Sequence, residues 1–387
     1  MNRLLLFIFA LVLLANFCSA QITIQNDSLF FKQKEMFEKL GVLEAWKTTR
    51  GNPEILIGCI DMGFDFYHPY LHDRLIPGYY AEDVYHTENY QTIAHGTLVS
   101  SLMVANPKNV NGMWGLAPQC KVLTASLGII EHPFAKLMNE IKKNNPGMSQ
   151  IDIVKETGKE ISKDTLTAQQ FVKPWVDFVI EATSNSIVYL VDNGVRVINI
   201  SIYTFKPEFN KAFDYARAHD VLIVVGSGNG NKEVPKTLLN KDNIIVVGAS
   251  TKSDTRWEVK AGGITQGSNW GEELDVCAPS EDVVVCEPAD PRFYKIENGP
   301  VGVGNTPYKG ISQILKYGAT SCATPIVTSL AALIFSIAPN LTANEVKQAI
   351  IDGCDDIGEE GFDIYTGYGR INFEKTLSLI SNRKKKK

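Results

Sequence analysis

Short apolar runs alternate along the chain with longer segments of helical period. Four runs rich in Val and Ile predict strands over residues 55–61, 195–201, 221–225 and 244–248. The intervening and following segments predict helices over residues 95–105, 177–193, 210–219, 324–337 and 343–352. Nearly continuous apolar strands that alternate with helices are typical of a parallel sheet covered on both faces. The pattern predicts an α/β fold with a doubly wound, mostly parallel sheet, and Thr342 is expected to cap its last helix.

Two stretches interrupt this alternation. Residues 130–173 are polar and rich in Lys, with a short helical segment near 134–143, and we interpret them as an insertion. Residues 288–316 are rich in Gly, Pro and Tyr and precede Ser321, as loops that line a cleft often do. Neither stretch is expected to form a domain of its own.

The first twenty residues have the pattern of an export signal. An apolar run from Leu4 to Phe17 is followed by Cys18-Ser19-Ala20, which is typical of a signal peptide cleaved after Ala20. This run is too short to cross a bilayer core of roughly 30 Å. A retained anchor and lipid attachment at Cys18 are alternatives, and the bulky Phe17 disfavours the second. We expect a secreted or extracytoplasmic protein with no stable membrane span.

Composition narrows the possible partners. Hydrophobic residues make up 44% of the chain and charged residues 21%, as in ordinary globular proteins. A net charge of −5 gives no electrostatic reason to expect nucleic acid or an anionic membrane as a partner. The basic tail at 381–387 is expected to be solvated and disordered.

The six cysteines beyond residue 20 do not have the spacing of a metal site. They are Cys59, Cys120, Cys277, Cys286, Cys322 and Cys354. Export permits disulfides, but the sequence does not fix a pairing. Cys59, Cys277 and Cys322 lie in apolar runs or next to candidate functional residues, so buried free thiols are at least as good an expectation there as bridges.

Polar residues follow three of the apolar runs. In an open parallel sheet, functional side chains collect at the carboxyl ends of the strands. Asp61 ends the first run, Ser201-Ile202-Tyr203 ends the second, and Asn229 follows the third among glycines. Asp61 is expected to be partly buried and to need a partner to stay ionised. Taken alone, Asp61 also fits a loop cap and Asn229 a turn residue.

Two further residues lie at predicted helix starts. His95 opens a helix, where the helix dipole disfavours imidazolium and favours a neutral base. Ser321 lies among small residues that lead into a helix with Pro325 near its first turn. Taken alone, Ser321 would be interpreted as a helix N-cap.

These residues occur together in motifs that resemble the subtilisin family. Asp61-Met-Gly, His95-Gly-Thr and Thr320-Ser-Cys-Ala-Thr-Pro325 are similar to its three active-site motifs, in the Asp, His, Ser order already known for subtilisin. Further similarity covers residues 112–118, 197–201, 228–230, 274–279 and 367–372. The resemblance implies a subtilisin-like peptidase domain over residues 40–380. Residues 21–39 are then a short N-terminal segment with no room for a full prodomain.

The resemblance also implies a mechanism. Ser321 would attack the scissile carbonyl, His95 would transfer the proton, and Asp61 would orient His95. The Asn229 amide and the Ser321 N–H would bind the oxyanion of an acyl-enzyme pathway. The implied activity is that of a secreted serine endopeptidase acting on proteins or peptides, with no cofactor required for the chemistry. His95 and Asn229 argue against a related acid-acting branch that uses Glu and Asp at these places.

Some positions depart from the family pattern. The edge Ser201-Ile202-Tyr203 would bind substrate, but Tyr203 replaces an expected small residue there, so the substrate preference is not carried over. Tyr70 stands where calcium-binding members tend to carry Asp, which makes structural calcium doubtful although carbonyls of residues 106–111 remain available. Leu98 and Ala319 are smaller departures.

Two other functions are compatible with the sequence. The first is a catalytically silent subtilisin-like pseudoprotease that binds peptides through the edge at Ser201-Ile202-Tyr203. The second is a protease dedicated to processing one partner protein, which the insertion at 130–173 permits.

Overall fold

A seven-stranded sheet forms the centre of the molecule. The computed structural model describes residues 28–81, 95–107, 112–127, 140–141, 143–148, 156, 173–202, 205–237, 241–261, 264–286 and 312–385. Its sheet has the order β2-β3-β1-β4-β5-β6-β9, and every neighbouring pair is parallel. The strands are β1 (Leu56–Asp61), β2 (Leu75–Tyr80), β3 (Lys121–Ser126), β4 (Val197–Ile200), β5 (Leu222–Gly226), β6 (Ile244–Ser250) and β9 (Val276–Pro279). The predicted α/β fold is confirmed.

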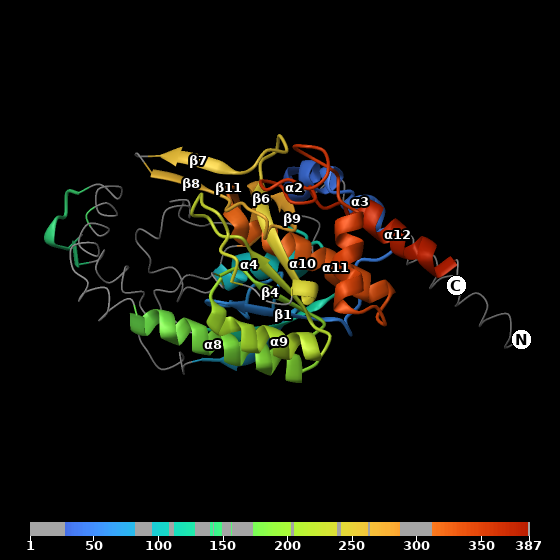
Figure 1. Ribbon diagram of the computed structural model, residues 1–387, viewed down its shortest axis with the longest axis horizontal. Coiled ribbons are helices and arrows are strands. Elements are labelled where there is room, and N and C mark those ends of the chain that lie inside the picture. The colour runs from blue at the N-terminus through green and yellow to red at the C-terminus, as the bar shows by residue number, and fades with distance from the viewer. Residues whose placement is uncertain are drawn as a thin grey trace, which may run out of the picture.

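Helices cover both faces of this sheet (Figure 1). They are α2 (Ser28–Lys39), α3 (Val42–Ala45), α4 (His95–Val104), α8 (Lys173–Asp192), α9 (Asn210–Ala218), α10 (Ala319–Ile337), α11 (Ala343–Asp352) and α12 (Phe373–Lys385). Helices α4 and α10 pack on one face, whereas α8 and α9 pack on the other. Two short 3-10 helices cover Pro207–Phe209 and Lys241–Asn243.

Burial on both faces explains the continuous apolar strands. In β5, Leu222 and Val224 face the core beneath α10, whereas Ile223 and Val225 face the core beneath α8 and α9. Side chains alternate between the faces of a strand, so a strand covered on both sides needs apolar residues at every position. This is why the four predicted strands could be found from composition alone.

The less regular strands were not predicted. Strand β2 contains Pro77 and Gly78 and lies at the sheet edge, where proline is tolerated because one side of the strand needs no donor. Two small antiparallel sheets lie outside the main sheet. They pair β7 (Glu258–Ala261) with β8 (Ile264–Gly267), and β10 (Glu281–Cys286) with β11 (Ser312–Tyr317).

The predicted cap of α11 is present as a capping box. The Thr342 hydroxyl accepts a hydrogen bond from the Glu345 N–H at 3.2 Å, and the Glu345 carboxylate accepts one from the Thr342 N–H at 2.8 Å. This arrangement satisfies two backbone donors that the helix leaves unpaired. Local sequence determined this helix from residue 343 to residue 352, as predicted.

The prediction for α10 was wrong at its start. The helix begins at Ala319 rather than at residue 324, so Ser321 lies in the first turn and Pro325 lies inside the helix. Gly318 is the N-cap residue, and its carbonyl accepts a hydrogen bond from the Cys322 N–H at 3.2 Å. An N–H at position 325 would donate to the Ser321 carbonyl, and Pro325 has none. Proline is tolerated there because the Ser201 hydroxyl donates to this carbonyl instead.

Within the described part of the chain, α10 is the one helix long and apolar enough to cross a membrane. Of its apolar window, 83% is buried inside the molecule, against the sheet and α4. It is therefore placed as the central helix of the core.

The described part of residues 21–39 belongs to this core. In α2, Phe30 and Phe37 are at most 2% exposed. The Gln33 side chain forms hydrogen bonds with both the N–H and the carbonyl of Trp114, at 2.9 and 2.8 Å. Helix α2 lies near α3, which in turn packs beside the C-terminal helix α12 (Figure 1). Helix α12 extends to Lys385, so the expectation of a disordered tail was wrong for residues 381–385.

Charged side chains join this N-terminal helix to the C-terminal part of the chain. Arg370 is 8% exposed and pairs with Asp254 and with Asp355, the latter at 2.7 Å. Lys39, at the end of α2, pairs with Asp254 at 2.8 Å. Burial raises the pKa of both carboxyls, but their hydrogen bonds to Arg370 and the lysines outweigh this, so both pKa values fall below the usual 3.8.

We expect Arg370→Met to weaken the fold at pH 7 and to make its stability less sensitive to acid. In the wild type, the depressed pKa values of Asp254 and Asp355 contribute stability above pH ~4 that is lost as the pH falls through the folded pKa values. Urea unfolding between pH 3 and pH 7 measures this loss. Lys260→Met, at an exposed pair with Glu258, is the control. Identical pH slopes in Arg370→Met and the wild type would contradict the role of the cluster.

Candidate active site

Three adjacent strands end at the site. Strands β1, β4 and β5 are neighbours, and their carboxyl ends lead to Asp61, Ser201 and Asn229. The first residues of two helices meet them there, His95 from α4 and Ser321 from α10. Because all three strands are parallel, residues far apart in sequence come to one edge of the sheet.

Asp61 and His95 are in direct contact. The Asp61 side chain is fully buried, and its Oδ1 lies 2.7 Å from Nδ1 of His95. The Met62 N–H donates a hydrogen bond to the same oxygen at 2.6 Å. An ionised carboxylate only accepts hydrogen bonds, so Nδ1 of His95 carries the proton and Nε2 is the free acceptor of the neutral ring. The partners expected for a buried Asp61 are therefore present.

The expected effect on His95 was wrong in its net direction. Burial lowers the pKa of His95, but the negative charge of Asp61 and the hydrogen bond to it together raise that pKa above the usual 6.5. The prediction took into account that the start of a helix disfavours a cation, but it left out the charge of the Asp61 carboxylate. At 2.7 Å the carboxylate outweighs the burial, so the net shift of the His95 pKa is upward.

Ser321 is held beside the end of β4 by a reciprocal contact. The Ser201 hydroxyl donates to the Ser321 carbonyl at 3.2 Å, and the Ser321 hydroxyl lies 3.5 Å from the Ser201 carbonyl. The Ser321 carbonyl is available because residue 325, four positions later, is proline and has no N–H. Asn199 donates to the Ser201 hydroxyl at 3.1 Å and so orients it.

Ser321 and His95 share no hydrogen bond, although both belong to the described residues. In structures without substrate, such contacts are often long and shorten only in the reacting complex. What the fold provides is a His95 ring fixed by Asp61 and a Ser321 fixed by Ser201, both at the same edge of the sheet.

Ala319 has a larger structural effect than its sequence suggests. Its φ of 52° lies in the left-handed region, which glycine adopts freely. For an L-residue this region costs about 1 kcal/mol or more. The backbone that leads into Ser321 is therefore strained where the family usually carries glycine.

The side chain of Asn229 is oriented by Thr320. Its Oδ1 accepts hydrogen bonds from the Thr320 N–H at 3.0 Å and from the Thr320 hydroxyl at 2.8 Å. A backbone N–H can only donate, so the atom facing it must be the amide oxygen. Nδ2 of Asn229 is thereby left as a donor that no protein acceptor among the described residues engages.

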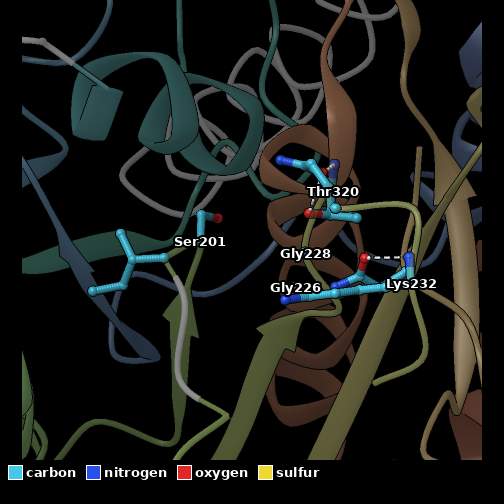
Figure 2. A pocket seen from close by; sticks show the side chains of 9 residues that line it. Ser201, Gly226, Gly228, Lys232 and Thr320 are labelled. Atoms are coloured by element: carbon cyan, nitrogen blue, oxygen red, sulfur yellow. Dashed lines mark hydrogen bonds between the residues drawn. The ribbon is translucent and has the colours of Figure 1, made fainter. Parts of the chain in front are cut away.

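A cavity of about 250 Å³ adjoins Asn229. Its lining residues are Ser201, Ile202, Gly226, Gly228, Asn229, Gly230, Lys232, Asn269 and Thr320. Ser201 and Ile202 are thus at the predicted edge, whereas Tyr203 lies outside the described residues. Figure 2 shows Ser201 on one side of the cavity and Thr320 with Lys232 on the other.

Three lining residues were missed in the sequence. Thr320 is adjacent to Ser321 and could have been examined as its neighbour. Lys232 and Asn269 carry no recognisable motif, and Asn269 comes from a segment after β8. Asn269 is 1% exposed and holds the cavity wall together by donating to the Ser227 carbonyl at 2.8 Å and accepting from the Lys232 N–H at 3.2 Å.

Metal ligands do not gather in the described part of the chain. No group of three His, Cys, Asp or Glu side chains there is placed to hold an ion. Tyr70 is 8% exposed and packs edge-on against His68, with ring centroids 5.5 Å apart, so it contributes packing where a carboxylate ligand was considered. The neighbouring loop lies partly outside the described residues.

All six cysteines are free thiols in the structure. The expectation of buried thiols at Cys59, Cys277 and Cys322 is confirmed. Burial raises the pKa of Cys277 and of Cys322, next to Ser321, to about 12. These thiols are therefore protonated near neutral pH and poor nucleophiles.

Comparison with known proteins gives the family. A model of the subtilase family matches residues 52–369, and the chain belongs to this family. The chain is 25% identical over 331 residues to a protein named thermophilic serine proteinase from Bacillus sp. (strain AK1), covering 85% of this chain and 63% of the relative. It is 25% identical over 357 residues to fervidolysin from Fervidobacterium pennivorans, covering 88% of this chain and 43% of the relative.

Solved structures give the same fold. The prenylagaramide maturation protease PagA superimposes with a TM-score of 0.57 at 19% identity, covering 88% of this chain and 98% of the other. The chain spans under two thirds of the length of the two curated relatives above. Because the sequence identity to the solved structure is only 19%, the structural likeness establishes the fold alone.

We expect Asp61→Asn to lower the pKa of His95. The substitution removes the negative charge that raises this pKa and leaves the burial that lowers it, so the value should fall below 6.5. A proton NMR titration of the His95 ring measures the change. Asp214→Asn, on α9 on the opposite face of the sheet, is the control and should leave the titration unchanged. An unaltered His95 pKa in Asp61→Asn would show that the carboxylate does not govern it.

Proposed function

We propose that this protein is a serine endopeptidase in which Ser321 is the nucleophile, His95 the general base and acid, and Asp61 the group that orients His95. The observation that carries the proposal is the 2.7 Å contact between Asp61 and His95 at the sheet edge that also holds Ser321 and Asn229. Membership of the subtilase family supports it. The substrates are proteins or peptides, and the chemistry needs no cofactor.

In the first half of the reaction, Oγ of Ser321 attacks the carbonyl carbon while Nε2 of His95 accepts the hydroxyl proton. The Asp61 carboxylate stabilises the imidazolium that forms, in keeping with the raised pKa of His95. The oxyanion accepts hydrogen bonds from Nδ2 of Asn229 and the Ser321 N–H. The C–N bond then breaks as His95 protonates the leaving amine, which leaves an ester on Ser321.

Water completes the cycle. His95 takes a proton from water, whose oxygen attacks the ester carbon, and the same proton returns to Oγ of Ser321 as the C–O bond breaks. The products are an acid and the free enzyme. His95 acts as a base only when it is neutral, so activity is expected to rise with pH through its raised pKa.

Thr320 has a defined place in this scheme. It fixes the Asn229 amide through two hydrogen bonds to Oδ1, so the donor is oriented before the oxyanion forms. Preorganised donors stabilise a transition state better than mobile ones because they pay no reorganisation cost during the reaction.

A fluorophosphonate probe, which reacts with activated serines, tests the proposal. The wild-type protein should be labelled covalently, and Ser321→Ala should not. Asn229→Ala should be labelled more slowly, because the phosphoryl oxygen loses a donor; the corresponding change in subtilisin lowers turnover about 10²–10³-fold, a value taken from that enzyme. Mass spectrometry of the labelled peptide identifies the modified residue.

Ser336→Ala, on the same helix but outside the site, is the matched control and should react like the wild type. Folded wild-type protein that is not labelled would overturn the proposal in favour of a silent, peptide-binding pseudoprotease. Broad cleavage of a peptide library would argue against a processing enzyme with one dedicated partner.

We also propose that the protein is exported and that its signal peptide is removed after Ala20. The support is the apolar run from Leu4 to Phe17 followed by small residues up to Ala20. N-terminal sequencing of the protein from a secreting host should begin at Gln21. Recovery of a membrane-bound protein that still contains residues 1–20 would contradict cleavage.

A further inference from the structure

The cavity lies where one particular substrate side chain must go. Its lining includes Thr320, which orients Asn229, and Ser201, whose carbonyl accepts from the Ser321 hydroxyl. A peptide whose carbonyl carbon faces Ser321 and whose oxygen faces Asn229 has the side chain of that same residue beside these groups. This residue, on the acyl side of the cleaved bond, is called the acyl residue below.

The cavity carries one charge. Of its nine lining residues, Lys232 alone is ionisable, and the others are glycines, amides, hydroxyl residues and Ile202. Lys232 forms no ion pair within the described part of the chain and is exposed to solvent. An ammonium group in a ligand cavity, without a protein counterion, attracts a carboxylate and repels a cation.

The side chain of Lys232 lines the cavity and stays exposed to solvent. Its Cε lies 3.3 Å from the place that a Cβ on Gly230 would occupy, so its apolar stem covers Gly230. Its backbone N–H is fixed by the Asn269 side chain at 3.2 Å. Figure 2 shows the stem extending from its own wall toward the side of the cavity on which Ser201 lies.

Neighbouring acidic side chains are directed elsewhere. The Glu233 side chain turns toward Gly271, with its Cγ 3.0 Å from the place of a Gly271 Cβ. Glu272 pairs with Lys236, a second lysine that does not line the cavity. Among the described residues, neither of these carboxylates pairs with Lys232.

We propose that Lys232 is a specificity residue that makes the enzyme prefer Glu or Asp as the acyl residue. This rests on the proposed endopeptidase function. The carboxylate of the substrate pairs with the Lys232 ammonium, and the cavity of about 250 Å³ takes its methylene groups. A Gln side chain has nearly the shape of Glu but no charge, so the comparison of Glu with Gln isolates the effect of charge. A Lys side chain is repelled by the Lys232 ammonium.

Internally quenched peptides that differ only at the acyl residue test this preference. The wild type should cleave the Glu peptide with a kcat/KM about tenfold above that of the Gln peptide, as for a charge-assisted hydrogen bond in a partly solvated site. Lys232→Met should reduce this ratio to about one, and Lys232→Glu should favour the Lys peptide. High salt should shrink the wild-type ratio and leave that of Lys232→Met unchanged.

Lys211→Met is the control, because this exposed lysine lies on α9, outside the cavity; it should keep the wild-type ratio. Equal cleavage of the Glu and Gln peptides by the wild type, or a Glu preference that survives Lys232→Met, would overturn the proposal.

Binding separates this inference from the proposed catalysis. Calorimetry with Ser321→Ala and intact peptides should give about tenfold tighter binding of the Glu peptide than of the Gln peptide, lost in Ser321→Ala/Lys232→Met. This result together with no fluorophosphonate labelling of the wild type would refute catalysis and retain the role of Lys232. Labelling of the wild type with equal binding of the two peptides would refute the role of Lys232 and retain catalysis.

Discussion

The contact between the first turns of α10 and the ends of β4 and β5 is the constraint on which the site depends. Gly226 allows this approach, because a Cβ there would lie 2.9 Å from the Thr324 hydroxyl. The close contact brings Thr320 to Asn229 and Ser321 to Ser201. A larger residue at 226 would displace the helix and with it Ser321, the proposed nucleophile.

The same contact compensates for the proline inside α10 by joining the helix to the end of β4. Pro325 removes a hydrogen bond from the first turns of α10, and the Ser201 hydroxyl supplies a donor to the carbonyl left free. Farther along, Thr328 donates to the buried Asn199 at 3.0 Å, and Asn199 orients Ser201. The side chains of Asn199, Ser201 and Thr328 thus satisfy one another beneath Ser321, which avoids a desolvation cost.

Chemistry and specificity have different origins in this molecule. Asp61, His95, Ser321 and Asn229 follow strands or open helices that the fold itself requires. The cavity beside them is formed by residues that only adjoin these elements, and its one charge comes from Lys232 on a connecting segment. Such a segment can change without disturbing the sheet, so the preference for a substrate can vary while the reaction is kept.

The sequence by itself determined the parallel α/β fold, four central strands and the capped helix α11. Burial on both faces requires continuous apolar runs, and capping requires particular residues at the start of a helix, so both can be recognised in the sequence. It also pointed to Asp61, His95, Ser321 and Asn229 through their motifs. Only the tertiary structure decided the sign of the His95 pKa shift, the early start of α10 and the place of Lys232 in the cavity lining. Each of these depends on contacts between residues far apart in sequence, such as the 2.7 Å approach of Asp61 to His95, which no local pattern encodes.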